Sequence, residues 1–318
     1  MKTLDLQIKL SVCFITYNHV NYVRQALDSV LMQQTDFDFE IVIGDDCSTD
    51  GTSQIIQEYL LLYPDRIRIN PIDSNKGMVA NWISTIQACK GTYIAMLEGD
   101  DYWTDPEKLK KQVHFLEKET DMVLVAHDVE FLRQVGSQAT DSLDHPAIDH
   151  DFMLNDLVNK QIFLQTASMV FRSSALPSFP RWVDSRVKSI DYVVYLMLLN
   201  QGKGHYLAQT MSTYRLHAAG ISHVNWVVQQ NRFEWDMLFI LTQFTKGASA
   251  ANQHALNTKI ETLLLTLVKN NAPESKDHRK ALLQLTRRNP RKYADLAKGY
   301  VIQRWVPKWL YNLYQKRK

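Results

Sequence analysis

The fold is decided by the stretch Phe39-Glu40-Ile41-Val42-Ile43-Gly44-Asp45-Asp46-Cys47-Ser48-Thr49-Asp50-Gly51-Thr52. Its first six residues are mostly apolar and predict a buried strand, and a helix pattern begins at Thr52. Asp50-Gly51-Thr52 is typical of a turn that caps this helix, and Asp45 is expected to be a structural partner of the turn. Asp46 would then lie at the carboxyl end of a strand, where open α/β sheets bind ligands.

The same alternation of strand and helix continues on both sides of this stretch. It predicts an α/β domain with a mostly parallel sheet flanked by helices over residues 1–225. Strand-like runs end before Trp226, so residues 226–318 are predicted to form a helical, basic C-terminal extension. The further predicted strands are Leu10–Thr16, Arg66–Asn70, Thr92–Leu97 and Met122–Ala126, and the predicted helices are Tyr22–Met32, Thr52–Leu62, Met78–Cys89 and one opening at Asp105-Pro106-Glu107.

Length and composition indicate an ordinary globular protein. The chain has 318 residues and is 45% hydrophobic, which is enough for a full core. Its three cysteines form no C-x-x-C pair, so neither a disulfide framework nor a zinc site is indicated. No export signal and no apolar run of about 20 residues is visible. These features predict a cytoplasmic location.

The net charge of +2 hides a strong asymmetry. Residues 276–318 carry thirteen Lys or Arg and two Asp, a net charge of +11, which leaves −9 for residues 1–275. The last fifteen residues, Arg304–Lys318, also mix Trp and Tyr with these cations. That composition suits a segment at the inner face of an anionic membrane, and equally a helix packed on the protein by its aromatic side. Nucleic-acid binding is not expected, because no recognised module accompanies the charge.

Polar motifs follow other predicted strands. Thr16-Tyr17-Asn18 follows the first, Glu98-Gly99-Asp100-Asp101 follows the strand ending at Leu97, and Asp191 and Tyr214-Arg215-Leu216-His217 come later. Carboxylates can accept hydrogen bonds from a base and a ribose, and can hold a divalent metal against a diphosphate. Asp46 and Asp100 suit the first task and Asp101 the second. These motifs predict a site for a nucleotide-activated sugar.

In order and spacing, these motifs resemble the family 2 inverting glycosyltransferases of the GT-A fold, of the bacterial surface-glycan type. The resemblance covers about residues 9–225 and includes Asn75-Lys76-Gly77 and Gly91-Thr92-Tyr93-Ile94. It implies a GT-A nucleotide-diphospho-sugar transferase fold, a nucleotide-sugar donor with a UDP-sugar favoured, and Mn or Mg as cofactor. The implied acceptor is a glycan or a lipid-linked glycan.

The resemblance also implies roles for single residues. Asp191 falls where the family has its general base, and Asp101, Asp100 and His217 fall at or near the metal. The donor-binding residues would be Thr16, Tyr17, Asn18, Asp46, Lys76, Asp100 and Arg215. The chain departs from the family at three points: Glu98 replaces an aspartate, Cys47 replaces a glycine, and Ile190 replaces the acidic residue that usually precedes the base. Asp184 is close enough in sequence to compete with Asp191 for the role of base.

The predicted activity is transfer of a sugar, with inversion, from a nucleoside diphosphate to an acceptor hydroxyl in surface polysaccharide synthesis. Two alternatives remain at this point: a catalytically silent sugar-nucleotide binder or scaffold, and a nucleotidyltransferase. The second lacks a Gly-rich, Lys- or Arg-containing triphosphate loop after the first strand. His127-Asp128 is expected to be a structural pair, while Gln165, Thr166 and Ser168 are candidates for acceptor contacts. The polar loop from Arg133 to His150 is expected to lie over the site as solvent-exposed chain or as a lid.

Overall fold

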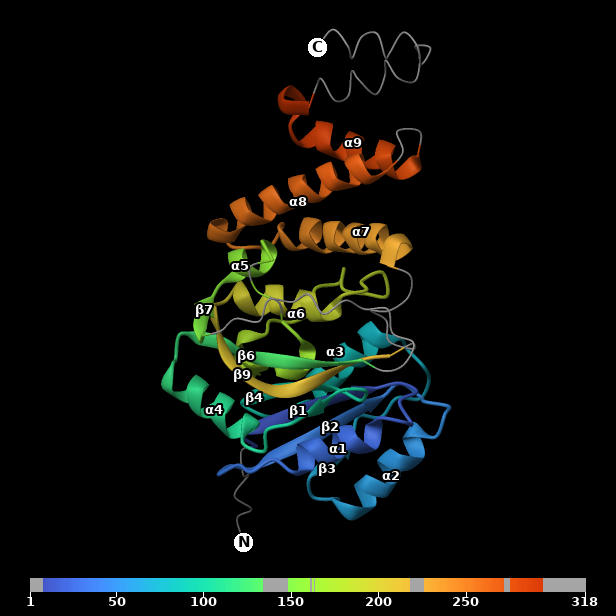
Figure 1. The fold of residues 1–318 in the computed structure, drawn as a ribbon, viewed down its shortest axis with the longest axis vertical. Coiled ribbons are helices and arrows are strands. Elements are labelled where there is room, and N and C mark those ends of the chain that lie inside the picture. The colour runs from blue at the N-terminus through green and yellow to red at the C-terminus, as the bar shows by residue number, and fades with distance from the viewer. Residues whose placement is uncertain are drawn as a thin grey trace. The chain divides into compact units, whose positions relative to one another are not determined.

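The computed structural model describes residues 8–133, 148–160, 162, 164–217, 226–271 and 275–293. Within it the chain divides into two compact units, Met1–Trp226 and Val227–Lys318 (Figure 1). Two segments singled out in the sequence fall outside the described residues: most of the polar loop, at 134–147, and the aromatic, basic segment at 304–318.

Four parallel strands form the first half of the sheet in unit 1. In sheet order they are β3 (Ile67–Ile69), β2 (Phe39–Asp45), β1 (Leu10–Thr16) and β4 (Tyr93–Glu98). Every residue of β1 is buried, as expected for a parallel strand covered on both faces. The register pairs the last residues of these strands, Thr16 with Asp45 and Ile15 with Glu98. Their carboxyl ends therefore meet at one edge of the sheet.

Helices cover both faces of this half. Apolar residues of α1 (Val23–Leu31), α2 (Thr52–Leu62) and α4 (Lys108–Lys118) join alternate residues of β1, β2 and β4 in one core cluster. The opposite face is covered by α3 (Met78–Ala88), whose Asn81 side chain donates to the Gly44 carbonyl at 2.9 Å. The two helix layers therefore hold β1, β2 and β4 between them.

The second half makes the sheet mixed, whereas the sequence predicted a mostly parallel one. β8 (Val170–Arg172) runs antiparallel between β4 and β6 (Met122–Arg133), and β6 pairs in parallel with β9 (Lys203–Leu216). β5 (Tyr102–Trp103) and β7 (His150–Phe152) pair antiparallel with β9. The connections hold the helices α5 (Leu154–Val158) and α6 (Ile190–Leu199) and the 3₁₀ turns η1 (Thr166–Ser168) and η2 (Ser173–Ala175).

The second unit is helical in its described part. It contains α7 (Trp226–Phe244), which begins at the last residue of the first unit, α8 (Ala250–Asn270) and α9 (Lys276–Arg288). α8 buries Leu256, Ile260, Leu264 and Leu267, a spacing of three and four residues that places them on one helix face. Among the described residues, none of the helices is both long and apolar enough to cross a membrane.

Candidate active site

The turns that follow β1 and β4 approach each other closely. The Gly99 amide donates to the Ile15 carbonyl at 2.8 Å, and the Asp46 amide donates to the Thr16 carbonyl at 3.1 Å. A β-carbon on Gly99 would lie 2.4 Å from Thr16 Oγ1, closer than real contacts allow. Glycine at position 99 therefore lets the acidic turn after β4 lie against the end of β1.

Two aspartates after β2 are structural, as the sequence predicted. Asp45 Oδ1 accepts from the Ser48 amide at 3.1 Å, and Asp50 Oδ1 accepts from the Thr52 amide at 3.0 Å. Asp50 Oδ2 accepts from the Val20 amide at 3.0 Å. Burial raises the pKa of Asp50, but these hydrogen bonds to the charged form outweigh it and lower the pKa. Asp45 therefore shapes the turn, and Asp50 accepts from the first amide of the helix.

Asn18 ties the turn after β1 to the turn after β2. Its side-chain Oδ1 accepts from the Thr49 backbone amide at 2.8 Å, and its backbone amide donates to Ser48 Oγ at 2.8 Å. Asn18 and Cys47 both have left-handed backbone, with φ of 57° and 60°. Tyr17, beside Asn18, is 44% exposed at this edge. Its ring is thus open to solvent between two fixed turns.

Asp46 is buried and organises the segment before α3. Its Oδ1 accepts from the Lys76 amide at 2.8 Å and its Oδ2 from the Gly77 amide at 2.9 Å. The Asn75 side chain donates to the Asp46 carbonyl at 3.0 Å. Each carboxylate oxygen can accept a further hydrogen bond. Lys76 is brought to the same edge, with an exposed side chain.

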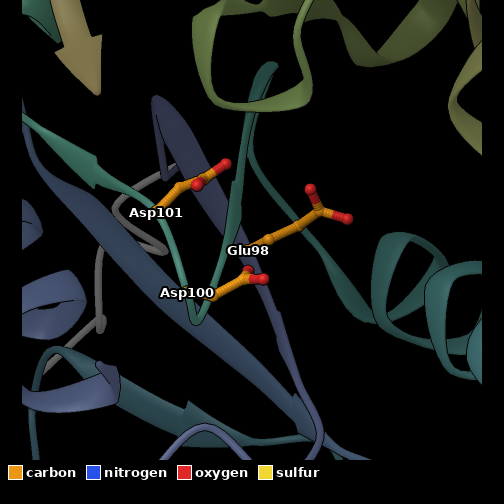
Figure 2. Close-up of side chains that lie close together, drawn as sticks. All are labelled: Glu98, Asp100 and Asp101. Atoms are coloured by element: carbon orange, nitrogen blue, oxygen red, sulfur yellow. The ribbon is translucent and has the colours of Figure 1, made fainter. Parts of the chain in front are cut away.

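Three carboxyl groups gather at the turn that ends β4. Figure 2 shows the side chains of Glu98, Asp100 and Asp101 there. One carboxylate oxygen of each lies within 4.8 Å of one oxygen of each of the other two. Asp101 is 1% exposed, and its Oδ1 accepts from the Arg215 amide at 2.9 Å. Its Oδ2 is buried without a hydrogen-bond partner in the described part of the chain. Burial and then the charges of Asp100 and Glu98 raise the pKa of Asp101 well above its usual value. An unpaired buried oxygen in an oxygen-only donor set fits a hard divalent cation.

Two imidazoles face the Asp100 carboxylate. His217 Nε2 lies 3.1 Å from Asp100 Oδ2, and His19 Nε2 lies 3.6 Å from the same oxygen. Burial raises the pKa of Asp100, but the hydrogen bond to His217 and the charges of His19 and His217 outweigh burial. The pKa of Asp100 is therefore lowered. His19 also contacts Thr16 Oγ1 through Nδ1 at 3.1 Å. His19 was not among the predicted site residues, although it directly follows Thr16-Tyr17-Asn18.

Arg215 is buried and holds the acidic turn in place. Its guanidinium donates to the Asp100 carbonyl and, at 2.5 Å, to Gln25 Oε1. The guanidinium carbon lies 4.4 Å from the ring centre of Tyr102 and 5.2 Å from that of Tyr22. Burial lowers the pKa of Arg215, and these neighbours oppose the shift. The predicted donor-binding residue thus reaches the site with its guanidinium engaged by the protein.

The structure separates the two candidates for the base. Asp191 lies in the first turn of α6, and its charge is among the causes, after burial and Asp100, that raise the pKa of Glu98. Asp191 is therefore near the acidic turn. Asp184 is exposed and bonded to Arg186 at 2.7 Å, and hydrogen bonds from Arg186 lower its pKa to about 2. A carboxylate so paired is a weak base.

The remaining candidates around the site have mixed outcomes. His127 is buried and its Nδ1 lies 2.7 Å from the Asp128 carbonyl oxygen, while the Asp128 carboxylate accepts from Tyr206 and Thr210 at 3.0 and 2.8 Å. The pair is structural, as predicted. Ser168 is buried in η1 and its hydroxyl donates to the Gln165 carbonyl at 2.7 Å. This bond leaves the Ser168 hydroxyl oxygen as an acceptor only.

Curated relatives match part of the chain. A Mycobacterium tuberculosis protein, Rv1520, described as uncharacterized, is 37% identical over 214 residues, which are 67% of this chain and 60% of that one. The chain thus spans about three-fifths of the length of this curated relative. TuaG of Bacillus subtilis, described as a putative teichuronic acid biosynthesis glycosyltransferase, is 36% identical over 107 residues, 34% of this chain and 41% of that one.

Solved structures share the fold. TarS 1–349 of S. aureus, in complex with UDP-GlcNAc, has a TM-score of 0.67 at 18% identity and covers 91% of this chain and 84% of its own. The mannosyltransferase PcManGT of Pyrobaculum calidifontis, in complex with GDP-Man and Mn²⁺, has a TM-score of 0.58 at 14% identity. The match covers 97% of this chain and 83% of that one. The expected GT-A fold is confirmed. Residues 11–176, more than half of the chain, match the family described as glycosyl transferase family 2, and the chain belongs to that family.

Proposed function

We propose that this protein is an inverting, metal-dependent glycosyltransferase that moves one sugar from a nucleoside-diphosphate donor to an acceptor hydroxyl. The observation that carries the proposal is the convergence of Glu98, Asp100 and Asp101 on one turn, with Asp191 near Glu98. The orphaned Oδ2 of Asp101 supports it further, since a buried carboxylate oxygen without a partner is costly unless a ligand completes it.

The donor would lie across the carboxyl ends of β1, β2 and β4. We assign Thr16, Tyr17, Asn18 and Asp46 to the nucleoside, and Lys76 and Arg215 to further contacts with the donor. Asp100 and Asp101, with His217 beside them, are assigned to a divalent cation, either Mn²⁺ or Mg²⁺. Such a cation would stabilise the negative charge on the departing diphosphate. A UDP-sugar is favoured, because TarS was solved with UDP-GlcNAc.

Asp191 is proposed as the general base. Its carboxylate takes the proton of the acceptor hydroxyl while that oxygen forms a bond to the anomeric carbon. The bond from this carbon to the diphosphate oxygen breaks on the opposite face, so the configuration inverts.

The proposed acceptor is a growing surface glycan or its lipid carrier. The support is the relative TuaG, which is described as a putative teichuronic acid biosynthesis glycosyltransferase. The proposed docking of residues 304–318 on an anionic membrane would bring a lipid-linked acceptor close, and rests on their composition alone. The acceptor therefore has to be found by experiment.

A panel of UDP-, GDP- and dTDP-sugars tests the proposal. We expect the full chain with Mn²⁺ or Mg²⁺ to bind one donor best and to release its nucleoside diphosphate slowly to water. Asp101→Asn should abolish the metal-dependent binding, and Asp191→Asn should keep binding while lowering kcat about 10²-fold or more. Folded protein that binds no donor would favour a scaffold, and pyrophosphate release from nucleoside triphosphates would favour a nucleotidyltransferase.

A further inference from the structure

His19 is a site residue to which the proposed reaction gives no role. Its side chain lies against Gly99, where a β-carbon would be 3.0 Å from His19 Nδ1 and 2.4 Å from Thr16 Oγ1. The backbone of His19 serves the start of α1, because its amide donates to Thr52 Oγ1 at 2.8 Å and its carbonyl accepts from the Val23 amide at 2.8 Å. These bonds do not need an imidazole, so the side chain calls for a further explanation.

Two polar groups face the two ring nitrogens of His19. Nδ1 lies 3.1 Å from Thr16 Oγ1, and Nε2 lies 3.6 Å from Asp100 Oδ2. Burial lowers the pKa of His19 and outweighs the carboxylate charges that oppose the shift, so the neutral ring is favoured at neutral pH. A neutral imidazole has one N–H and one acceptor nitrogen, and a carboxylate can only accept. The proton therefore belongs on Nε2, and Nδ1 accepts from the Thr16 hydroxyl.

We propose that His19 is a positioning residue, which holds the Asp100 carboxylate in place for the divalent cation while the Thr16 hydroxyl orients its ring. His217 Nε2 approaches the same oxygen of Asp100 at 3.1 Å, and the two imidazole rings stand at 89° to each other. The Asp100 side chain is 20% exposed, so water competes for its carboxylate, and the two rings reduce its freedom to turn away from Asp101. Partners of this kind orient metal-binding carboxylates. The inference rests on the proposed function, because it needs the cation at Asp100 and Asp101.

Two amide variants of His19 separate the roles of its nitrogens. The glutamine amide stands at the same position along the side chain as Nε2, so His19→Gln keeps an N–H donor for Asp100. The asparagine amide reaches only as far as Nδ1, so His19→Asn loses that donor. Calorimetry measures the Kd of Mn²⁺ alone for the full chain and for each variant. We expect His19→Asn to weaken Mn²⁺ binding about tenfold, and His19→Gln less than about threefold, because the contact with Asp100 is only 3.6 Å long.

Thr16→Val tests whether the hydroxyl acts through the ring. Alone it should weaken Mn²⁺ binding about threefold, because Nδ1 loses the donor that orients it. In a His19→Asn background it should change the Kd by less than about twofold, since the ring is already gone. Measuring Mn²⁺ without nucleotide keeps this comparison separate from the contacts with the nucleoside assigned to Thr16.

Unfolding temperatures in EDTA test the alternative that the His19 side chain only packs. Both variants keep the backbone bonds of His19, so they should unfold within about 2 °C of each other. Equal weakening of Mn²⁺ binding in both variants, wild-type affinity in His19→Asn, or a much lower unfolding temperature for His19→Asn than for His19→Gln would each overturn the inference alone. A folded wild type that binds no Mn²⁺ would overturn the metal site of the proposed function, and the inference with it.

Discussion

Cys47 holds a backbone conformation that costs free energy. Its φ of 60° is left-handed, a region that disfavours any residue with a β-carbon by roughly 1–2 kcal/mol. The Sγ contact with the Ile72 carbonyl at 3.3 Å is too weak to offset this. We expect Cys47→Gly to raise the free energy of unfolding by about 1 kcal/mol, measured by urea denaturation. Cys47→Ala keeps the strained φ and should show no gain; a gain in both variants would refute the backbone explanation.

Asp101 lowers the folding stability of the metal-free protein at the position proposed to bind the metal. Because its pKa is raised in the folded state, the stability that it contributes is full below about pH 3.9 and is lost as pH rises through the folded pKa. At neutral pH this buried group therefore lowers the stability of the metal-free protein, because the fold disfavours its charged form. We expect Asp101→Asn to raise the unfolding temperature in EDTA, and to lose the further rise that Mn²⁺ gives the wild type.

Asp105 serves as a control, because its pKa is shifted in the direction opposite to that of Asp101. Burial raises its pKa, but the ion pair with Lys111 at 2.6 Å and other hydrogen bonds outweigh burial and lower it. Asp105→Asn should therefore lower the unfolding temperature in EDTA and leave the gain from Mn²⁺ intact. If Asp101→Asn also lowered the unfolding temperature in EDTA, burial of an unpaired charge at the acidic turn would be the wrong account of it.

Single residues differ in how far the sequence reveals them. Asp45 and Asp50 were predicted as structural because their partners lie within a few residues and follow known turn chemistry. His19 was missed because it faces the Asp100 carboxylate from a distant segment, which only the folded sheet brings near. Local patterns thus identify caps, while long-range polar contacts need the tertiary structure.

Among the helices and strands, the buried parallel strands could be predicted from the sequence. β1 matches its predicted bounds and β2 extends only one residue further, because both are continuous apolar runs with helices after them. β8 was missed because it has three residues, too few for a pattern, and β9 because its polar residues interrupt the alternation. Their pairing with β6 depends on contacts remote in sequence, so the mixed half of the sheet was not predicted.

The packing of α4 on β6 buries two basic groups together. Lys108 is fully buried, with its Nζ donating to Gln112 Oε1 at 2.7 Å and 4.2 Å from the Trp103 ring centre, and burial lowers its pKa well below the usual value. Burial and then the Lys108 charge lower the pKa of His127, whose Nε2 has no hydrogen-bond partner in the described chain. Within the part of the chain that the structure describes, neither group forms a hydrogen bond or ion pair with a carboxylate. Protonation of His127 should therefore be costly.

This burial predicts a pH dependence of stability. A depressed folded pKa means that the contribution of His127 is full above about pH 6.5 and is lost as pH falls toward the folded pKa. From pH 7 to pH 5, wild-type unfolding free energy should fall relative to His127→Leu by up to about 1.4 kcal/mol per pH unit below 6.5. Lys108→Met removes a neighbouring positive charge and should reduce this fall. Urea denaturation at both pH values checks the difference, and parallel slopes for wild type and His127→Leu would contradict it.

At the scale of the whole molecule, every residue assigned to the proposed site lies in Met1–Trp226, and that unit has its own buried core. We therefore expect a chain ended at residue 226 to fold and to keep metal-dependent nucleotide-sugar binding within about threefold of the full chain, measured by calorimetry. Circular dichroism provides the control for folding. A folded fragment without binding would mean that residues 227–318 contribute to the donor site. Transfer to lipid-linked acceptors is the activity that the fragment should lose, because the basic, aromatic segment proposed to dock on the membrane belongs to the second unit.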